Sequence, residues 1–111
     1  MLFVRTNLKL PENKGRLDIY PGITDGDGVG VDIIGDPDGL RYLSDVLRAL
    51  AGYDQDSDNA PVGTREHVHL HRECQLGGHS CEVVVSRADA KGTGELPDFM
   101  KQSRRDGDKE S

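Results

Sequence analysis

The clearest pattern of hydrophobic and polar residues in the chain lies between residues 29 and 52. Val29, Val31 and Ile33 recur at a period of two, which predicts a half-buried strand. Leucines then recur at three- and four-residue spacing over roughly four turns, which predicts an amphipathic helix. This strand and the helix that follows it form the centre of the predicted fold.

The predicted helix carries a signal at each end. Asp36 precedes Pro37, so we expect the aspartate to be the N-cap and the proline to be the first helical residue. Gly52 fits the C′ position that ends a helix. One apolar stripe is predicted to face a covering sheet, and it comprises Leu40, Leu43, Val46, Leu47, Leu50 and Ala51.

Four further segments have the hydrophobic alternation or apolar content of strands: residues 1–10, 16–20, 66–71 and 81–86. Residues 21–28 are predicted as a loop, residues 53–65 as a mobile polar linker, and residues 75–80 as a hairpin turn containing two glycines. The chain is therefore predicted to be α+β. One amphipathic helix packs on one face of a small, largely antiparallel sheet of about five strands.

Length and composition predict one small domain. The chain has 111 residues, of which 34% are hydrophobic and 14 are glycine, so its core must be modest. Near the C-terminus the composition changes to Lys, Asp, Gly, Glu and Ser without hydrophobic periodicity. We expect a single domain over residues 1–90 and a charged, disordered tail over residues 91–111, in which Leu96, Phe99 and Met100 form at most a short docking turn.

The net charge is −6, and it is unevenly distributed. Residues 12–60 hold eleven acidic and four basic side chains. This charge argues against a nucleic-acid-binding protein and permits an acidic surface that meets a basic partner. The chain has no run of about 18 apolar residues and no signal-peptide pattern, so we expect a cytoplasmic protein without a membrane partner. Cys74 and Cys81 are interpreted as ordinary reduced thiols.

An antiparallel sheet covered by one helix leaves its second face open, and a polar open face is tolerated. The alternation of residues predicts which side chains this face displays: Asp18, Asp32, His67, His69, His71, Glu82 and Ser86. This open face is the predicted place for a partner to bind.

Three histidines share one face of the strand over residues 66–71, with neighbours about 6–7 Å apart. Imidazoles at this spacing can chelate a transition metal. A straight strand, however, holds His67 and His71 about 13 Å apart, too far for both to reach one ion without a bend. Solvent-facing histidines are the simpler interpretation, and a metal site at His67, His69 and His71 is the alternative. We predict no cofactor.

Other motifs do not predict a reaction. Residues 24–29 resemble a calcium loop, but Asp36 falls where such a loop requires a glutamate. His79, Ser80 and Cys81 are neighbours in sequence, without the surrounding pattern of a nucleophile elbow, a P-loop or a dinucleotide site. No catalytic residue is predicted.

Three segments together resemble the Immunity protein 32 family: residues 34–51, 67–70 and 80–85. Gly35 to Leu40 is similar to the family's Gly–polar–X–X–Gly-Leu helix start, and His67 to Leu70 is similar to its His-X-His-Leu strand. Ser80 opens the last strand, as in the family. The resemblance implies a small α+β protein of a bacterial polymorphic toxin system.

The same resemblance implies the function. The chain would bind and neutralise a cognate protein toxin domain produced by the same cell, without catalysis. Apart from the resemblance, we expect the chain to be a monomer or weak dimer. The residues expected to contact the toxin are Asp18, Asp32, His67, His69 and Glu82. Two alternatives stay open: an adaptor or regulatory domain that dimerises through an exposed edge strand, and a metal-binding protein that uses the histidine strand.

Overall fold

The computed structural model describes residues 8–23 and 29–102. Two helices, one short 3-10 helix and four strands occur in this part of the chain. In chain order they are β1 (Leu17–Ile23), β2 (Val29–Gly35), α1 (Pro37–Gly52), η1 (Gln55–Ser57), β3 (His67–Leu70), β4 (Val83–Ser86) and α2 (Asp98–Gln102). The predicted α+β class is confirmed.

The strands form two separate antiparallel sheets of two strands each. β1 pairs with β2 from Leu17↔Gly35 to Ile23↔Val29, and β3 pairs with β4 from His67↔Ser86 to Leu70↔Val83. The expectation of one sheet of about five strands is therefore wrong. Residues 8–10 of the predicted first strand are not in a strand, and residues 1–7 lie outside the described residues. The predicted calcium-like loop also falls largely outside them, at residues 24–28.

The connection between β3 and β4 explains why the sheets stay apart. It is longer than the predicted hairpin turn, and its backbone bonds the outer edge of β1 at two points. Gly77 N donates to Leu17 O at 2.9 Å, and Cys81 N donates to Ile19 O at 2.8 Å. Between them the buried Ser80 hydroxyl donates to Ile19 O and accepts from Ile19 N. A connection thus occupies the edge that another strand would need, and Ser80 has a structural role.

Helix α1 begins as predicted. Asp36 is the N-cap and its Oδ1 accepts from Gly39 N at 2.7 Å, with Pro37 in the first turn. The same carboxylate accepts from Arg16 N, and these two backbone donors hold the pKa of Asp36 below its ordinary value. The predicted C-terminus is wrong by two residues, because Gly52 was expected at C′, one residue beyond the C-cap, whereas Gly52 is still helical and Tyr53 is the C-cap.

The face that α1 turns toward the core differs from the predicted stripe. Tyr42, Val46 and Leu50 are buried, whereas Leu40 and Leu47 are 46% and 45% exposed. Burial raises the pKa of the Tyr42 hydroxyl. The core lies between α1 and both sheets and contains Leu17, Ile19, Tyr42, Val46, Val68, Leu70 and Leu76.

The loop after α1 is held to the body of the molecule, although it was expected to be a mobile linker. The buried Gln55 side chain donates to Asp89 O and accepts from Glu66 N. The buried Lys91 ammonium bonds Asp58 Oδ1 at 2.8 Å and two backbone oxygens of the same loop. Packing therefore continues past the expected domain boundary at residue 90. Residues 103–111 of the expected tail lie outside the described residues.

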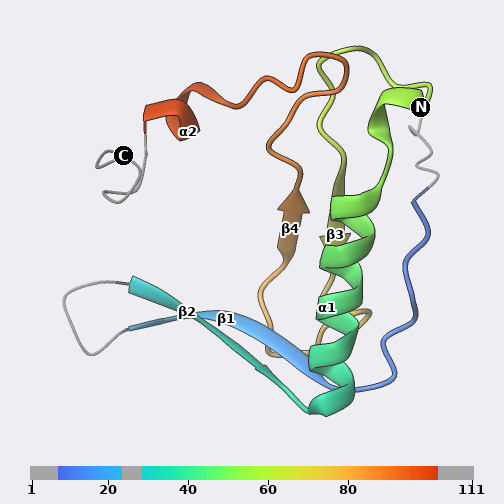
Figure 1. Cartoon of the computed structure of the whole chain (residues 1–111). Coiled ribbons are helices and arrows are strands. Elements are labelled where there is room, and N and C mark those ends of the chain that lie inside the picture. The colour runs from blue at the N-terminus through green and yellow to red at the C-terminus, as the bar shows by residue number, and fades with distance from the viewer. Residues whose placement is uncertain (1–7, 24–28, 103–111) are drawn as a thin grey trace, which may run out of the picture.

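The elements give the molecule an open shape (Figure 1). α1 packs across β3, and two projections extend from this body on the same side. One is the β1–β2 hairpin, and the other, which we call the C-terminal arm, is residues 92–102 with α2 near its end. No helix in the described part of the chain is long and apolar enough to cross a membrane.

Candidate partner-binding site

An apolar face of the hairpin extends beyond the core. Residues paired across two strands share a face of the sheet, and Ile33 pairs with Ile19 while Val31 pairs with Pro21. Ile19 is buried in the core, so Ile33 and Val31 point to the same side but lie farther along the hairpin. They are 51% and 67% exposed. This strand face is apolar without being covered.

Helix α1 and strand β4 continue the apolar surface. Leu40 and Leu47 are two turns apart on the same flank of α1. Leu40 reaches the hairpin, since a Cβ added to Gly35 would lie 3.2 Å from Leu40 Cγ. Val83 and Val85 of β4 pack against the core and are only half-buried. Apolar side chains of three elements thus border the same open space.

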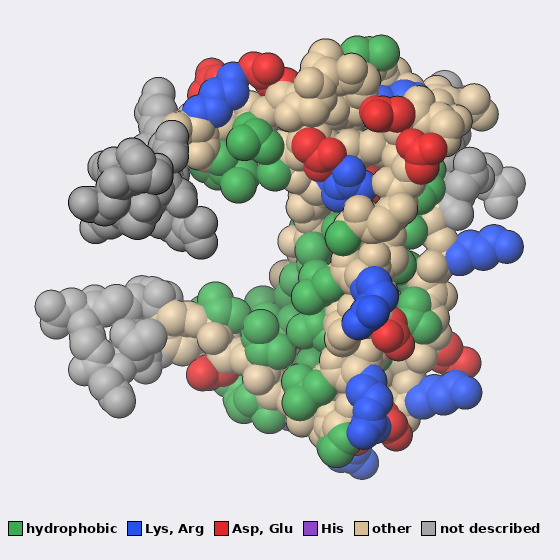
Figure 2. Space-filling model, in the orientation of Figure 1, with side chains coloured by type: hydrophobic (Ala, Val, Ile, Leu, Met, Phe, Trp, Pro, Cys, Tyr) green, Lys and Arg blue, Asp and Glu red, His purple; other side chains and the backbone are tan. Residues whose placement is uncertain are grey.

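Figure 2 shows this space as a hollow between the hairpin below and the C-terminal arm above. Hydrophobic side chains cover its wall and the underside of the arm. The exposed hydrophobic residues of the arm are Leu96, Phe99 and Met100, with Phe99 70% exposed. We define the apolar hollow by the exposed or half-buried apolar residues of the three elements that border it: Val31 and Ile33 of β2, Leu40 and Leu47 of α1, and Val83 and Val85 of β4.

The open shape is unusual for a chain of this length. The radius of gyration is 16.3 Å, whereas a compact chain of 111 residues has about 13 Å. Contiguous apolar surface that three elements leave open marks a place for a partner, because water is displaced from it when a complementary surface docks. The apolar hollow is therefore the strongest candidate binding surface in the described part of the chain.

The two projections that flank the hollow are acidic. The strands of the hairpin contain Asp18 and Asp32 and no lysine or arginine. The C-terminal arm contains Glu95, Asp98 and a single base, Lys101, which pairs with both acids. The Lys101 ammonium holds the pKa of Glu95 below its ordinary value. Each projection therefore carries more acid than base, although Asp18 and Asp32 lie on the face of the hairpin opposite to Val31 and Ile33.

The residues predicted to bind a partner do not share one face. Asp18 and Asp32 do lie on one side of the hairpin, because they pair with Ile34 and Tyr20 and alternate with the apolar positions. The histidines and Glu82 belong to the other sheet. The expectation of a single polar face is therefore wrong, since the two sheets do not join. The role of the five residues in binding stays a prediction.

The histidines form an exposed row along β3, turned away from the buried Val68 and Leu70. The ring centroids of His67 and His69 are 5.0 Å apart, and those of His69 and His71 are 5.8 Å apart and stacked. His71 Nδ1 lies 3.2 Å from Glu82 Oε2. Within residues 8–23 and 29–102, no three His, Cys, Asp or Glu side chains are arranged to hold one metal ion. No histidine is visible on the face with the hollow (Figure 2).

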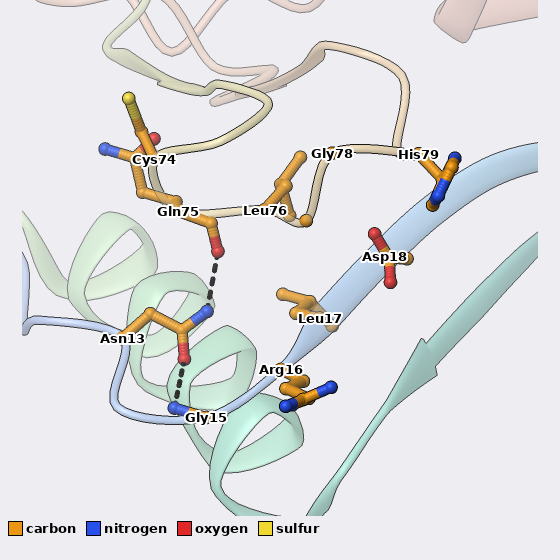
Figure 3. Close-up of a pocket in the computed structure, with 11 residues that line it drawn as sticks. Asn13, Gly15, Arg16, Leu17, Asp18, Cys74, Gln75, Leu76, Gly78 and His79 are labelled. Carbon is orange, nitrogen blue, oxygen red and sulfur yellow. Dashed lines mark hydrogen bonds between the residues drawn. The ribbon is translucent and has the colours of Figure 1, made fainter.

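A second concave feature lies between β1 and the β3–β4 connection (Figure 3). It is a cleft of about 360 Å³ lined by Asp18 and His79 at one end and Cys74 at the other. Asp18 Oδ1 is buried without a hydrogen-bond partner among the described residues. Asp18 therefore borders this cleft and does not belong to an open sheet face. Asn13 closes the cleft's edge by donating to Gln75 O at 2.6 Å.

The hydrophobic pattern of the sequence does not predict the apolar hollow. Ile33 and Ile34 are adjacent, so β2 carries an apolar side chain on each face, but only Ile33 lies on the side of the hollow. A strand with one covered face needs only one of them. The exposed Leu40 and Leu47 gave no signal, because their spacing is that of a buried stripe.

Comparison with known proteins places the chain in a family. No curated protein and no solved structure gives a significant match. Residues 30–88 match the family model described as Immunity protein 32. The matched region begins in β2 and contains α1, β3 and β4, and all six residues of the apolar hollow lie within it. Because the match spans more than half of the 111 residues, the chain belongs to the Immunity protein 32 family.

Proposed function

We propose that this protein binds a cognate toxin domain in the cytoplasm of the bacterium that produces both, and neutralises the toxin without catalysing a reaction. Membership of an immunity protein family is the observation that carries this proposal. The protein would act by stoichiometric occupation of a toxin surface.

Two physical features support a binding role. The apolar hollow offers surface that a protein partner can cover, and such burial supplies the main driving force of association. The net charge of −6 favours approach by a basic protein, because opposite charges raise association rates. Toxin domains that act on nucleic acids need basic surfaces to bind the phosphate backbone, so an acidic inhibitor suits such a target.

The test uses the toxin domain encoded beside the gene of this chain. We expect co-expression of the chain to restore growth of cells that produce the toxin, and calorimetry to give a 1:1 complex. With purified components, inhibition should require one equivalent of the chain. Protection by a small fraction of an equivalent would contradict a non-catalytic mechanism, and absence of both protection and binding would refute the proposal.

A further inference from the structure

We propose that the apolar hollow is the docking surface of the toxin, and that the toxin fills it with a protruding apolar element, a helix or a hairpin, flanked by basic side chains. This inference rests on the proposed function and adds the surface and the chemistry of the partner.

The depth of the hollow and its apolar wall define the shape of the occupant. Apolar side chains of β2, α1 and β4 border the hollow, which lies between the hairpin and the C-terminal arm (Figure 2). A flat partner surface would contact the two projections but would not displace water from the apolar wall between them. A ridge can contact Leu40 and Leu47 on one side and Ile33 on another, and central, fully desolvated apolar contacts dominate binding energy.

The charges beside the hollow favour a basic toxin over a second copy of this chain. Asp98 on the arm is 92% exposed, and Asp32 is exposed on the face of the hairpin opposite to Ile33. On α1, the charged side chains of the outer face balance each other, with Arg41 paired to Asp38. Two copies, each with a net charge of −6, would bring like-charged projections together. A toxin with lysine or arginine at the base of its ridge would meet opposite charge.

Matched substitutions test the surface. Ile33→Asp places a charge in the hollow, and Val84→Asp places the same charge at an equally exposed position, 54% against 51%, on the histidine face of β4. We expect Ile33→Asp to weaken toxin binding at least 30-fold, roughly the effect of a strong interface residue, and Val84→Asp to change it less than about 3-fold. Leu47→Asp should act like Ile33→Asp. Circular dichroism and melting temperature establish that each variant folds, and Ile33→Ser replaces Ile33→Asp if the aspartate unfolds the hairpin.

A second pair of variants tests the charge. Asp32→Asn and Asp98→Asn together should lower the association rate with the toxin several-fold at low salt and reduce its salt dependence. Asp45→Asn, on the outer face of α1, is the control and should leave the rate unchanged. An association rate that is the same for the double variant, the control variant and the wild-type chain would contradict a basic partner at this surface.

The outcomes separate the two proposals. If the wild-type chain neither binds the toxin nor protects against it, the proposed function fails and this inference fails with it. If the wild-type chain binds but Ile33→Asp and Leu47→Asp bind equally well, the function stands and the hollow is not the docking surface. Sedimentation of the chain alone provides a third measurement. A dimer that Ile33→Asp dissociates, and that Val84→Asp does not, would show that a second copy occupies the hollow and would overturn the inference.

Discussion

Gly39 and Gly52 lie in the same helix, and replacing each with alanine should change stability in opposite directions. A Cβ built on Gly39 would overlap the carbonyl oxygen of Arg16 and lie 2.6 Å from its carbonyl carbon. A Cβ built on Gly52 would meet no atom within 4 Å. The N-terminus of α1 therefore touches the start of β1 through a contact that only glycine permits, whereas the C-terminus of α1 is unobstructed.

The size of the effect follows from these distances. Carbon atoms in contact prefer about 3.5 Å, so Gly39→Ala must move α1 and Arg16 apart by about 1 Å. Overpacking of this kind costs about 1–3 kcal/mol, and weakening the backbone bond that Arg16 O accepts from the N-cap adds about 1 kcal/mol. The better helix propensity of alanine offsets at most about 1 kcal/mol of this loss in the free energy of unfolding. The net loss should be about 2 kcal/mol, while Gly52→Ala should gain about 0.4–1 kcal/mol.

Urea unfolding followed by far-UV circular dichroism measures both free energies of unfolding. The two variants share the same helix and the same chemical change, so helix propensity alone would give them the same sign. If Gly39→Ala is as stable as Gly52→Ala, or more stable than the wild-type chain, α1 does not approach β1 as closely as described.

Three further predictions concern other contacts. Ser80→Ala leaves the buried Ile19 N–H without its acceptor and should lower the free energy of unfolding by about 1–3 kcal/mol in the same assay. Lys91→Met removes a buried ammonium held by three oxygen atoms and should lower the melting temperature by several degrees, whereas Lys101→Met at the exposed arm should lower it little. The pKa of Asp36 lies below its ordinary value of 3.8. Its carboxylate therefore contributes to the free energy of unfolding above this pH, and the contribution is lost as the pH falls below about 4. Asp36→Asn keeps a capping oxygen but does not titrate. In urea titrations at several pH values, the free energy of unfolding of this variant should therefore depend less on pH in the acidic range than that of the wild-type chain.

The sequence predicted the parts of the fold that depend on neighbours in the chain. The Asp36 cap, the proline that follows it and the start of α1 were predicted correctly, because capping is decided by bonds within one helical turn. The alternation that turns His67 and His69 outward and Val68 and Leu70 inward was also confirmed. A strand imposes this alternation on its side chains whatever sheet it joins.

The site was predicted less well, because exposure depends on what the rest of the chain covers. Leu40 and Leu47 have the spacing of buried residues, and nothing in that spacing shows that the facing sheet ends before it reaches them. The sequence shows which positions of a helix are apolar, whereas the width of the surface packed against the helix determines how many of them are buried.

The sequence by itself determined the class of the fold, the helix and its N-cap, the inward and outward sides of β3, and the family. Tertiary structure alone decided that the strands form two sheets, that Asp18 borders a cleft, and that an apolar hollow opens between the hairpin and the C-terminal arm. The physical reason is the range of the interactions. Caps and alternation arise within a few residues, but the separation of the sheets depends on Ser80 and Gly77 bonding a strand about sixty residues away. Contacts over such distances leave no periodic signal in the chain.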